Sequence, residues 1–132
     1  MPLPTIDAMI GEEPLEEKLE AKKPDLTAIA DVLKETCFEE EIDDLQVGLD
    51  KTWELINDTI GFIEHEFGLT LERNPDLEAI EGWTKKDGYM CFRFTRHYDI
   101  LEVENGAIIF EINVEQLPGK NKIRLDAEVG PL

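Results

Sequence analysis

The sequence predicts an α+β protein in which two N-terminal helices, the second one long, pack on a four- to five-stranded antiparallel meander sheet. Two patterns carry this prediction. In the first half, apolar residues recur at spacings of three and four, which is typical of a helix with one buried face. In the second half, apolar and polar residues alternate, which is typical of strands. A length of 132 residues is that of one domain.

The long helix is expected over residues 42–67. Gly68 follows this stretch and suits a left-handed C-terminal cap. Gly61 lies inside it, and we expect it to allow close approach of a neighbouring element. The apolar stripe consists of Ile42, Leu45, Leu49, Trp53, Ile56, Ile60, Ile63 and Phe67.

A shorter helix is expected before it, from Asp25, which can cap its N-terminus, to about Cys37. Residues 1–24 contain four prolines, six acids and three lysines. We therefore divide the chain into an acidic flexible arm, 1–24, and a single α+β domain, 25–132.

The sheet is expected to begin near Leu69, with a short helical turn at Pro75. Strands are expected over 88–95 and 98–104, joined by a tight turn at Arg96-His97 or continuous as one long bent strand. Asn105-Gly106 is a strong hairpin signal and predicts a two-residue turn. A last strand is expected over 122–129.

The two faces of this sheet differ in character. The long helix should cover the face that carries Met90, Phe92, Leu101, Val103, Ile108, Phe110 and Ile112. The opposite face mixes apolar Tyr89, Cys91, Ile100 and Ile109 with Arg93, Glu102 and Glu111. A half-apolar face needs a cover, which could be the first helix, a second subunit or a partner, and of these we expect a homodimer.

The charge is strongly negative and unevenly distributed. The formal net charge is -18, of which residues 1–68 carry -14 and residues 69–132 carry -4. Such a field favours a basic protein partner. It argues against direct binding of nucleic acid or of an anionic membrane surface. No stretch approaches the roughly 20 apolar residues of a membrane span.

Catalytic and cofactor signatures are missing from the sequence. It has no serine, no phosphate-binding glycine loop and no Cys-x-x-Cys pair. Cys37 and Cys91 are expected to be reduced thiols in a cytoplasmic protein. His97 and Asp99 could lie on one side of a strand and bind a metal, but no third ligand is evident. We therefore expect a non-enzyme without cofactors.

Arg93, Arg96 and Arg124 have two interpretations. They could pair with acids of the same sheet, such as Glu111 and Asp126. Alternatively, they could form an anchor patch for a carboxylate ligand or an acidic partner.

The leading hypothesis is a small acidic interaction module, such as an inhibitor, an immunity-type factor, an adaptor or a chaperone, that binds a basic protein. Its expected partner-binding residues are Asp43, Asp44, Asp50, Glu54, Asp58, Tyr89, Arg93, Ile100 and Ile109.

Two alternatives remain open. A DNA mimic would present carboxylates spaced like phosphates, from Glu39, Glu40, Asp43, Asp44, Asp50, Glu54, Asp58 and Glu64. A small pocket enzyme or ligand-binding domain would enclose a cavity between helix and sheet, lined by Trp53, Trp83, Phe92, Phe94 and Tyr98.

Overall fold

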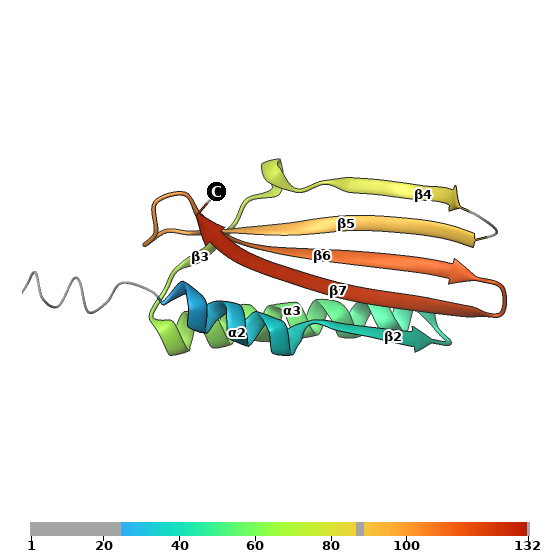
Figure 1. Ribbon diagram of the computed structural model, residues 1–132, viewed down its shortest axis with the longest axis horizontal. Coiled ribbons are helices and arrows are strands. Elements are labelled where there is room, and N and C mark those ends of the chain that lie inside the picture. Colours follow the sequence, from blue (N-terminus) through green and yellow to red (C-terminus); the bar gives the residue numbers. More distant parts are fainter. Residues whose placement is uncertain (1–24, 87–88, 132) are drawn as a thin grey trace, which may run out of the picture.

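The computed structural model describes residues 25–86 and 89–131 and confirms the α+β class. In this part of the chain, two helices lie along one side of an antiparallel sheet (Figure 1). The predicted arm, 1–24, falls outside the described residues. The elements in order are α2 (Leu26–Thr36), β2 (Phe38–Ile42), α3 (Leu45–Phe67), β3 (Leu71–Arg73), the 3₁₀ turn η1 (Pro75–Leu77), β4 (Ile80–Lys86), β5 (Tyr89–Ile100), β6 (Gly106–Leu117) and β7 (Lys120–Pro131).

Both helices are preceded by an aspartate, which is one of the residue types that capping chemistry favours. The carboxylate of Asp25 accepts hydrogen bonds from the backbone amides of Thr27 and Ala28, and so caps α2 as predicted. The carboxylate of Asp44 does the same for α3. Gly68 ends α3 in the left-handed conformation, with φ 63°. None of the helices in the described part of the chain is long and apolar enough to cross a membrane.

The long helix starts three residues later than predicted, because the segment before it is a strand. Ile42 ends β2, an edge strand that pairs antiparallel with β7. In the described residues the sheet therefore has six strands, in the order β2-β7-β6-β5-β3, with β4 also paired to β5. β3 and β4 occupy consecutive stretches of the same edge of β5.

The predicted two-residue hairpin at Asn105-Gly106 is wrong. β5 and β6 are joined by a five-residue loop, 101–105, and the register places Arg96 opposite Phe110. The loop is tied to the residue that precedes β3, since the Leu101 amide donates to the Thr70 carbonyl at 3.1 Å. Asn105 still adopts the positive φ (58°) that its residue type favours, so the dipeptide marks the turn but not its length.

The assignment of the sheet faces is partly confirmed. Ile108, Phe110 and Ile112 are fully buried in the core, as predicted. Because β5 is one continuous strand without a turn at Arg96-His97, the alternation carries on and places Ile100 in the core. Ile100 is only 1% exposed, whereas Leu101 lies in the loop and is 56% exposed. Both were assigned to the wrong side.

The glycine that permits a close approach is Gly48, not Gly61. A Cβ atom at Gly48 would overlap Ile42 and lie 2.9 Å from the Ile123 Cδ1 atom, so α3 meets β2 and β7 closely there. A Cβ atom at Gly61 would meet nothing within 4 Å. The explanation proposed for Gly61 is therefore wrong.

Candidate functional site: an acid-rimmed groove

A groove with an apolar floor runs between the two helices and β2. One part, of about 680 Å³, lies between the end of α2, β2 and the start of α3. A second part, of about 320 Å³, continues between α2 and α3 and shares Glu35, Thr36 and Leu55 with the first. Figure 1 shows these three elements side by side. The floor of this acid-rimmed groove is made by Val32, Phe38, Ile42, Val47, Leu55 and Phe62.

The rim of the groove is strongly acidic. Six acids and one lysine, Lys51, line it. Lys120 bonds to the Glu41 carboxylate at 2.8 Å and lowers its pKa, which keeps Glu41 charged. The acids are Glu35, Glu40, Glu41, Asp43, Asp44 and Asp58.

Two large apolar side chains of the floor are open to solvent. Val47 is 49% exposed and Phe62 is 50% exposed. Leu55 lies between them in sequence and is half-buried. Apolar surface surrounded by charge is the usual anatomy of a protein-binding site.

The structure brings three of the five predicted helical acids to the groove. Asp43, Asp44 and Asp58 line it. Asp44 also has a structural role as the cap of α3. Asp50 and Glu54 are exposed but lie outside the lining, and Asp50 accepts a hydrogen bond from the Gln46 side chain at 2.9 Å.

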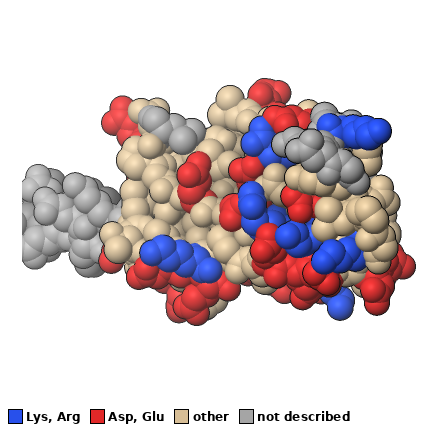
Figure 2. Space-filling view, turned by 45° about the vertical axis from the view of Figure 1, so that its right-hand side comes forward, with Lys and Arg blue, Asp and Glu red and all other residues tan. Residues whose placement is uncertain are grey.

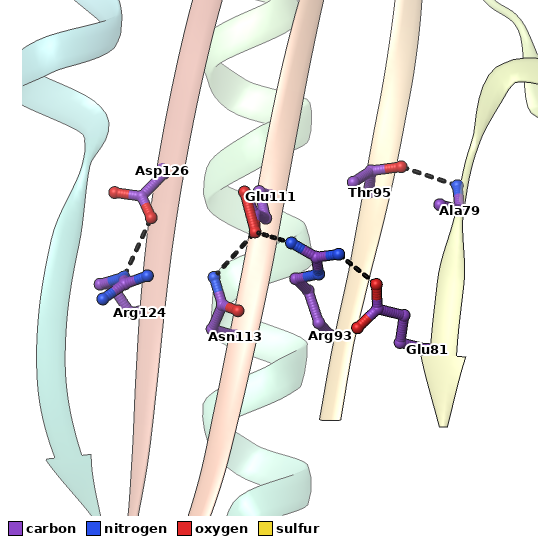
Figure 3. A network of polar contacts seen from close by, with 8 residues as sticks. All are labelled: Ala79, Glu81, Arg93, Thr95, Glu111, Asn113, Arg124 and Asp126. Carbon is purple, nitrogen blue, oxygen red and sulfur yellow. Dashed lines mark hydrogen bonds and ion pairs between the residues drawn. The ribbon is translucent and has the colours of Figure 1, made fainter. Parts of the chain in front are cut away.

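The arginines of the sheet are paired within the molecule, as the first interpretation predicted. Figure 3 shows Arg93 between Glu81 and Glu111, with 3.1 Å to the Glu111 carboxylate. Arg124 contacts Asp126 at 2.9 Å. Glu81 and Glu111 raise the pKa of Arg93 and hold it as a cation.

The surface around these arginines is a second, polar hollow on the outer face of the sheet. Its volume is about 360 Å³, and among the described residues three acids and three bases line it, so the formal charges of these residues balance. On the face drawn in Figure 2, basic side chains lie among acidic ones in the same way. The described charges of the polar hollow therefore do not favour a partner of one particular charge.

The four residues predicted to form a binding surface on the sheet are not brought together. Tyr89 and Arg93 line the polar hollow. Ile109 lines a separate depression of about 180 Å³ near the end of β7. Ile100 is buried in the core and cannot contact a partner, so its assignment to the binding surface is wrong.

The eight acids considered for DNA mimicry do not share one face. Glu39 pairs across the sheet with Arg124 and lines the polar hollow. Its neighbour Glu40 points to the opposite side of the strand and lines the acid-rimmed groove.

The interface between α3 and the sheet is packed by aromatic and cationic side chains. Trp53 and Phe94 lie with their ring centroids 5.0 Å apart, and Phe92 lies 5.2 Å from Phe94. The Arg96 guanidinium sits 4.1 Å from the centre of the Trp53 ring. Of the residues considered for a cavity lining, Trp83 has a side chain outside the described part.

His97 is a buried structural residue of β5. The expected tight turn at Arg96-His97 is therefore wrong, and the alternative of one continuous strand is confirmed. His97 is 3% exposed, and its Nε2 lies 2.9 Å from an Asp99 oxygen. In the described ranges, no group of three or more His, Cys, Asp or Glu side chains is placed to hold a metal ion. Cys37 and Cys91 are not bridged to each other, and burial raises the pKa of the Cys37 thiol.

The groove floor was not predicted, because the apolar stripe of the long helix that is most regular in the sequence is the one that faces the sheet. Val47, Leu55 and Phe62 form a second stripe, with spacings of eight and seven residues. At 3.6 residues per turn each spacing is about two turns, so the three residues lie within an arc of roughly 80° on one side of the helix. That arc was readable in the sequence.

A scan against protein-family models gives no match, and searches of curated proteins and of solved structures find none with significant similarity.

Proposed function

We propose that this protein is a non-catalytic interaction module that binds a basic protein partner in the acid-rimmed groove. The observation that carries the proposal is the coincidence of exposed apolar floor and acidic rim along one surface. The floor can supply the binding free energy through burial of Val47 and Phe62. The rim can attract and orient a positively charged partner.

The outer face of the sheet supports this proposal less well. Its cations already have anionic neighbours, so a carboxylate ligand would compete with existing ion pairs. The unbridged thiols fit a reducing compartment, and we infer a cytoplasmic location on that ground. An inhibitor, an immunity-type factor, an adaptor and a chaperone all fit a module of this kind.

The proposal is tested by comparing what the wild-type chain and two surface variants capture from host extract, with quantification by mass spectrometry. Val47→Glu removes an exposed apolar contact but keeps the rim acidic. Glu54→Gln is the control, because it changes an exposed residue of the same helix outside the groove lining.

A basic protein captured by the wild type and by Glu54→Gln, but depleted at least about tenfold with Val47→Glu, would support the proposal. Retention by Val47→Glu would contradict it, because a groove contact is then not needed. Retention together with steep loss of binding in salt would favour the DNA-mimic alternative, which needs charge alone.

A further inference from the structure

The edge strand β2 is open on the side that faces away from β7. Its five residues pair with β7 in the register Phe38 opposite Leu125 to Ile42 opposite Asn121, and β2 ends the strand order of the sheet. Within the described residues, β2 has no second strand partner. An antiparallel strand directs alternate amides and carbonyls to its two sides, so an open edge is a template for one more strand.

The larger part of the acid-rimmed groove lies beside this strand. Phe38, Glu40 and Ile42 point from β2 into it, and Val47 and Leu55 face them from α3. A strand added to β2 would place alternate side chains toward this groove and the others toward the outer face of the sheet. Backbone pairing and side-chain burial would therefore occur together.

The occupied side of β2 indicates which chemistry suits the open side. There, Glu39 lies opposite Arg124 and Glu41 lies opposite Lys122. Basic and apolar residues alternate along that part of β7, since Ile123 separates Lys122 from Arg124, Leu125 follows Arg124, and both apolar side chains are buried in the core. Opposite charges are the favourable cross-strand pairs. A second neighbour of the same acidic strand should follow the same rule.

From these observations we propose that the partner adds an extended segment to β2 as a seventh strand, with Lys or Arg alternating with apolar residues. The inference rests on the proposed function and specifies its binding mode. A second copy of this chain suits the edge poorly, because two β2 strands would oppose Glu39, Glu40 and Glu41 with one another. The acidic arm, 1–24, with six acids and three lysines, has the wrong charge for the same reason.

The test uses three synthetic ten-residue peptides of the same composition, five Lys and five Leu, with blocked ends and an N-terminal fluorophore. The first alternates Lys and Leu. The second has the same order but carries N-methyl groups on every interior backbone nitrogen, which prevents strand pairing. The third orders the residues for one apolar face of a helix. Affinities for the full chain are measured by fluorescence anisotropy at low and physiological salt, together with amide exchange of residues 38–42.

The alternating peptide should bind about tenfold or more tightly than its N-methylated form, since several ladder hydrogen bonds are lost in the latter. It should also slow amide exchange within β2. Val47→Glu should weaken its binding, and Glu54→Gln should not.

Equal affinity of the N-methylated and unmodified peptides, or preference for the helical order, would overturn the seventh-strand inference. In either case, if Val47→Glu still weakens the binding of the peptides, the groove remains the proposed site and only the strand-pairing mode fails. Binding of no peptide would also overturn the inference, and binding indifferent to Val47→Glu would count against the groove itself. If the chain elutes as a dimer whose β2 amides exchange slowly without peptide, a second copy covers the edge and the inference fails.

Discussion

At the scale of single residues, Glu78 holds the edge of the sheet together where strand pairing is interrupted. Between β3 and β4 the chain leaves β5 through η1, so the amide of His97 has no strand partner there. The Glu78 carboxylate accepts that amide at 3.1 Å, and the same carboxylate is bonded by Arg73 at 2.8 and 2.9 Å. Arg96 approaches it to 3.6 Å. The side chain of Glu78 is only 10% exposed, whereas that of Arg73 is 46% exposed, so solvent reaches this ion pair from the arginine side.

This arrangement makes stability depend on pH through Glu78. The hydrogen bond from Arg73, helped by the His97 amide and by Arg96, lowers the pKa of Glu78 in the folded protein. The folded pKa lies below the unfolded value of about 4.3. The stabilisation that Glu78 gives to the folded state is therefore fully present above about pH 4.3 and is lost as the pH falls through the folded pKa. Glu78→Gln should cost about 1–3 kcal/mol at neutral pH and progressively less on acidification.

Urea denaturation of both proteins from pH 7 to pH 3 measures this difference. Glu104→Gln, an exposed change in the β5–β6 loop, controls for the loss of one negative charge. A stability difference between wild type and Glu78→Gln that stays constant over the whole range would refute the assignment.

At the scale of the elements, α3 carries two apolar stripes with different tasks. One faces the sheet and contributes Ile56 and Ile63 to the core. The other forms the groove floor through Val47, Leu55 and Phe62. The start of α3 is fixed against the sheet at Gly48, where there is no room for a side chain unless its neighbours move.

Alanine substitution of the two interior glycines should therefore have opposite outcomes. Gly61→Ala should stabilise the protein by about 0.5–1 kcal/mol, because alanine favours the helix and the site is open. Gly48→Ala should be destabilising relative to Gly61→Ala by about 1 kcal/mol or more, because Ile42 and Ile123 must shift. Chemical denaturation compares the two variants directly, and equal stabilities would show that α3 does not approach the sheet closely at Gly48.

The same elements show how far the sequence could predict the fold. The helix over 45–67 and the last strand were predictable, because their spacings of three to four and of two are long and regular. β2 was not, because its middle is acidic and its partner β7 is about 80 residues away in the chain. The sequence pattern of β2 can be recognised only together with that of β7, because Glu39 and Glu41 match Arg124 and Lys122 only after the two strands are paired.

The candidate site was likewise predictable where single residue types decide and not where the spatial arrangement of distant elements decides. The charge of Asp43 and Asp58 and the internal pairing of Arg93 were readable from residue types. The groove itself required knowing where α2 ends relative to α3. The misplacement of Ile100 came from the expected tight turn at Arg96-His97, which reversed the alternation of the residues in the expected strand 98–104.

At the scale of the whole molecule, the two surfaces are suited to different associations. The acid-rimmed groove should repel other acidic chains, whereas the described charges that line the polar hollow on the outer face of the sheet balance. Self-association through the outer face, with Tyr89, Cys91 and Ile109, remains our prediction, although Ile100 does not contribute to it. Such a dimer would leave the groove free.

Light scattering at low micromolar concentration should detect this dimer, and added salt should strengthen it, because screening reduces repulsion between two chains of net charge -18. Ile109→Lys should shift the equilibrium toward monomer. A wild-type chain that stays monomeric in high salt would rule out the dimer.

The central claim is that the acid-rimmed groove, rather than the acidity of the whole molecule, selects the partner. It is tested most directly by the association rate with the captured basic partner, measured by stopped flow at low and physiological salt. The rim variant combines Asp43→Lys with Asp58→Lys, and the matched control combines Asp50→Lys with Glu54→Lys outside the groove lining. Asp44 is left unchanged because it caps α3.

Both variants change the net charge equally, so any difference between them reports on position. We predict that the rim variant associates about tenfold more slowly than the control at low salt, that the difference narrows as salt rises, and that dissociation changes less. Equal association rates for the two variants would contradict the account, because the acids of the groove would then act only through the net charge.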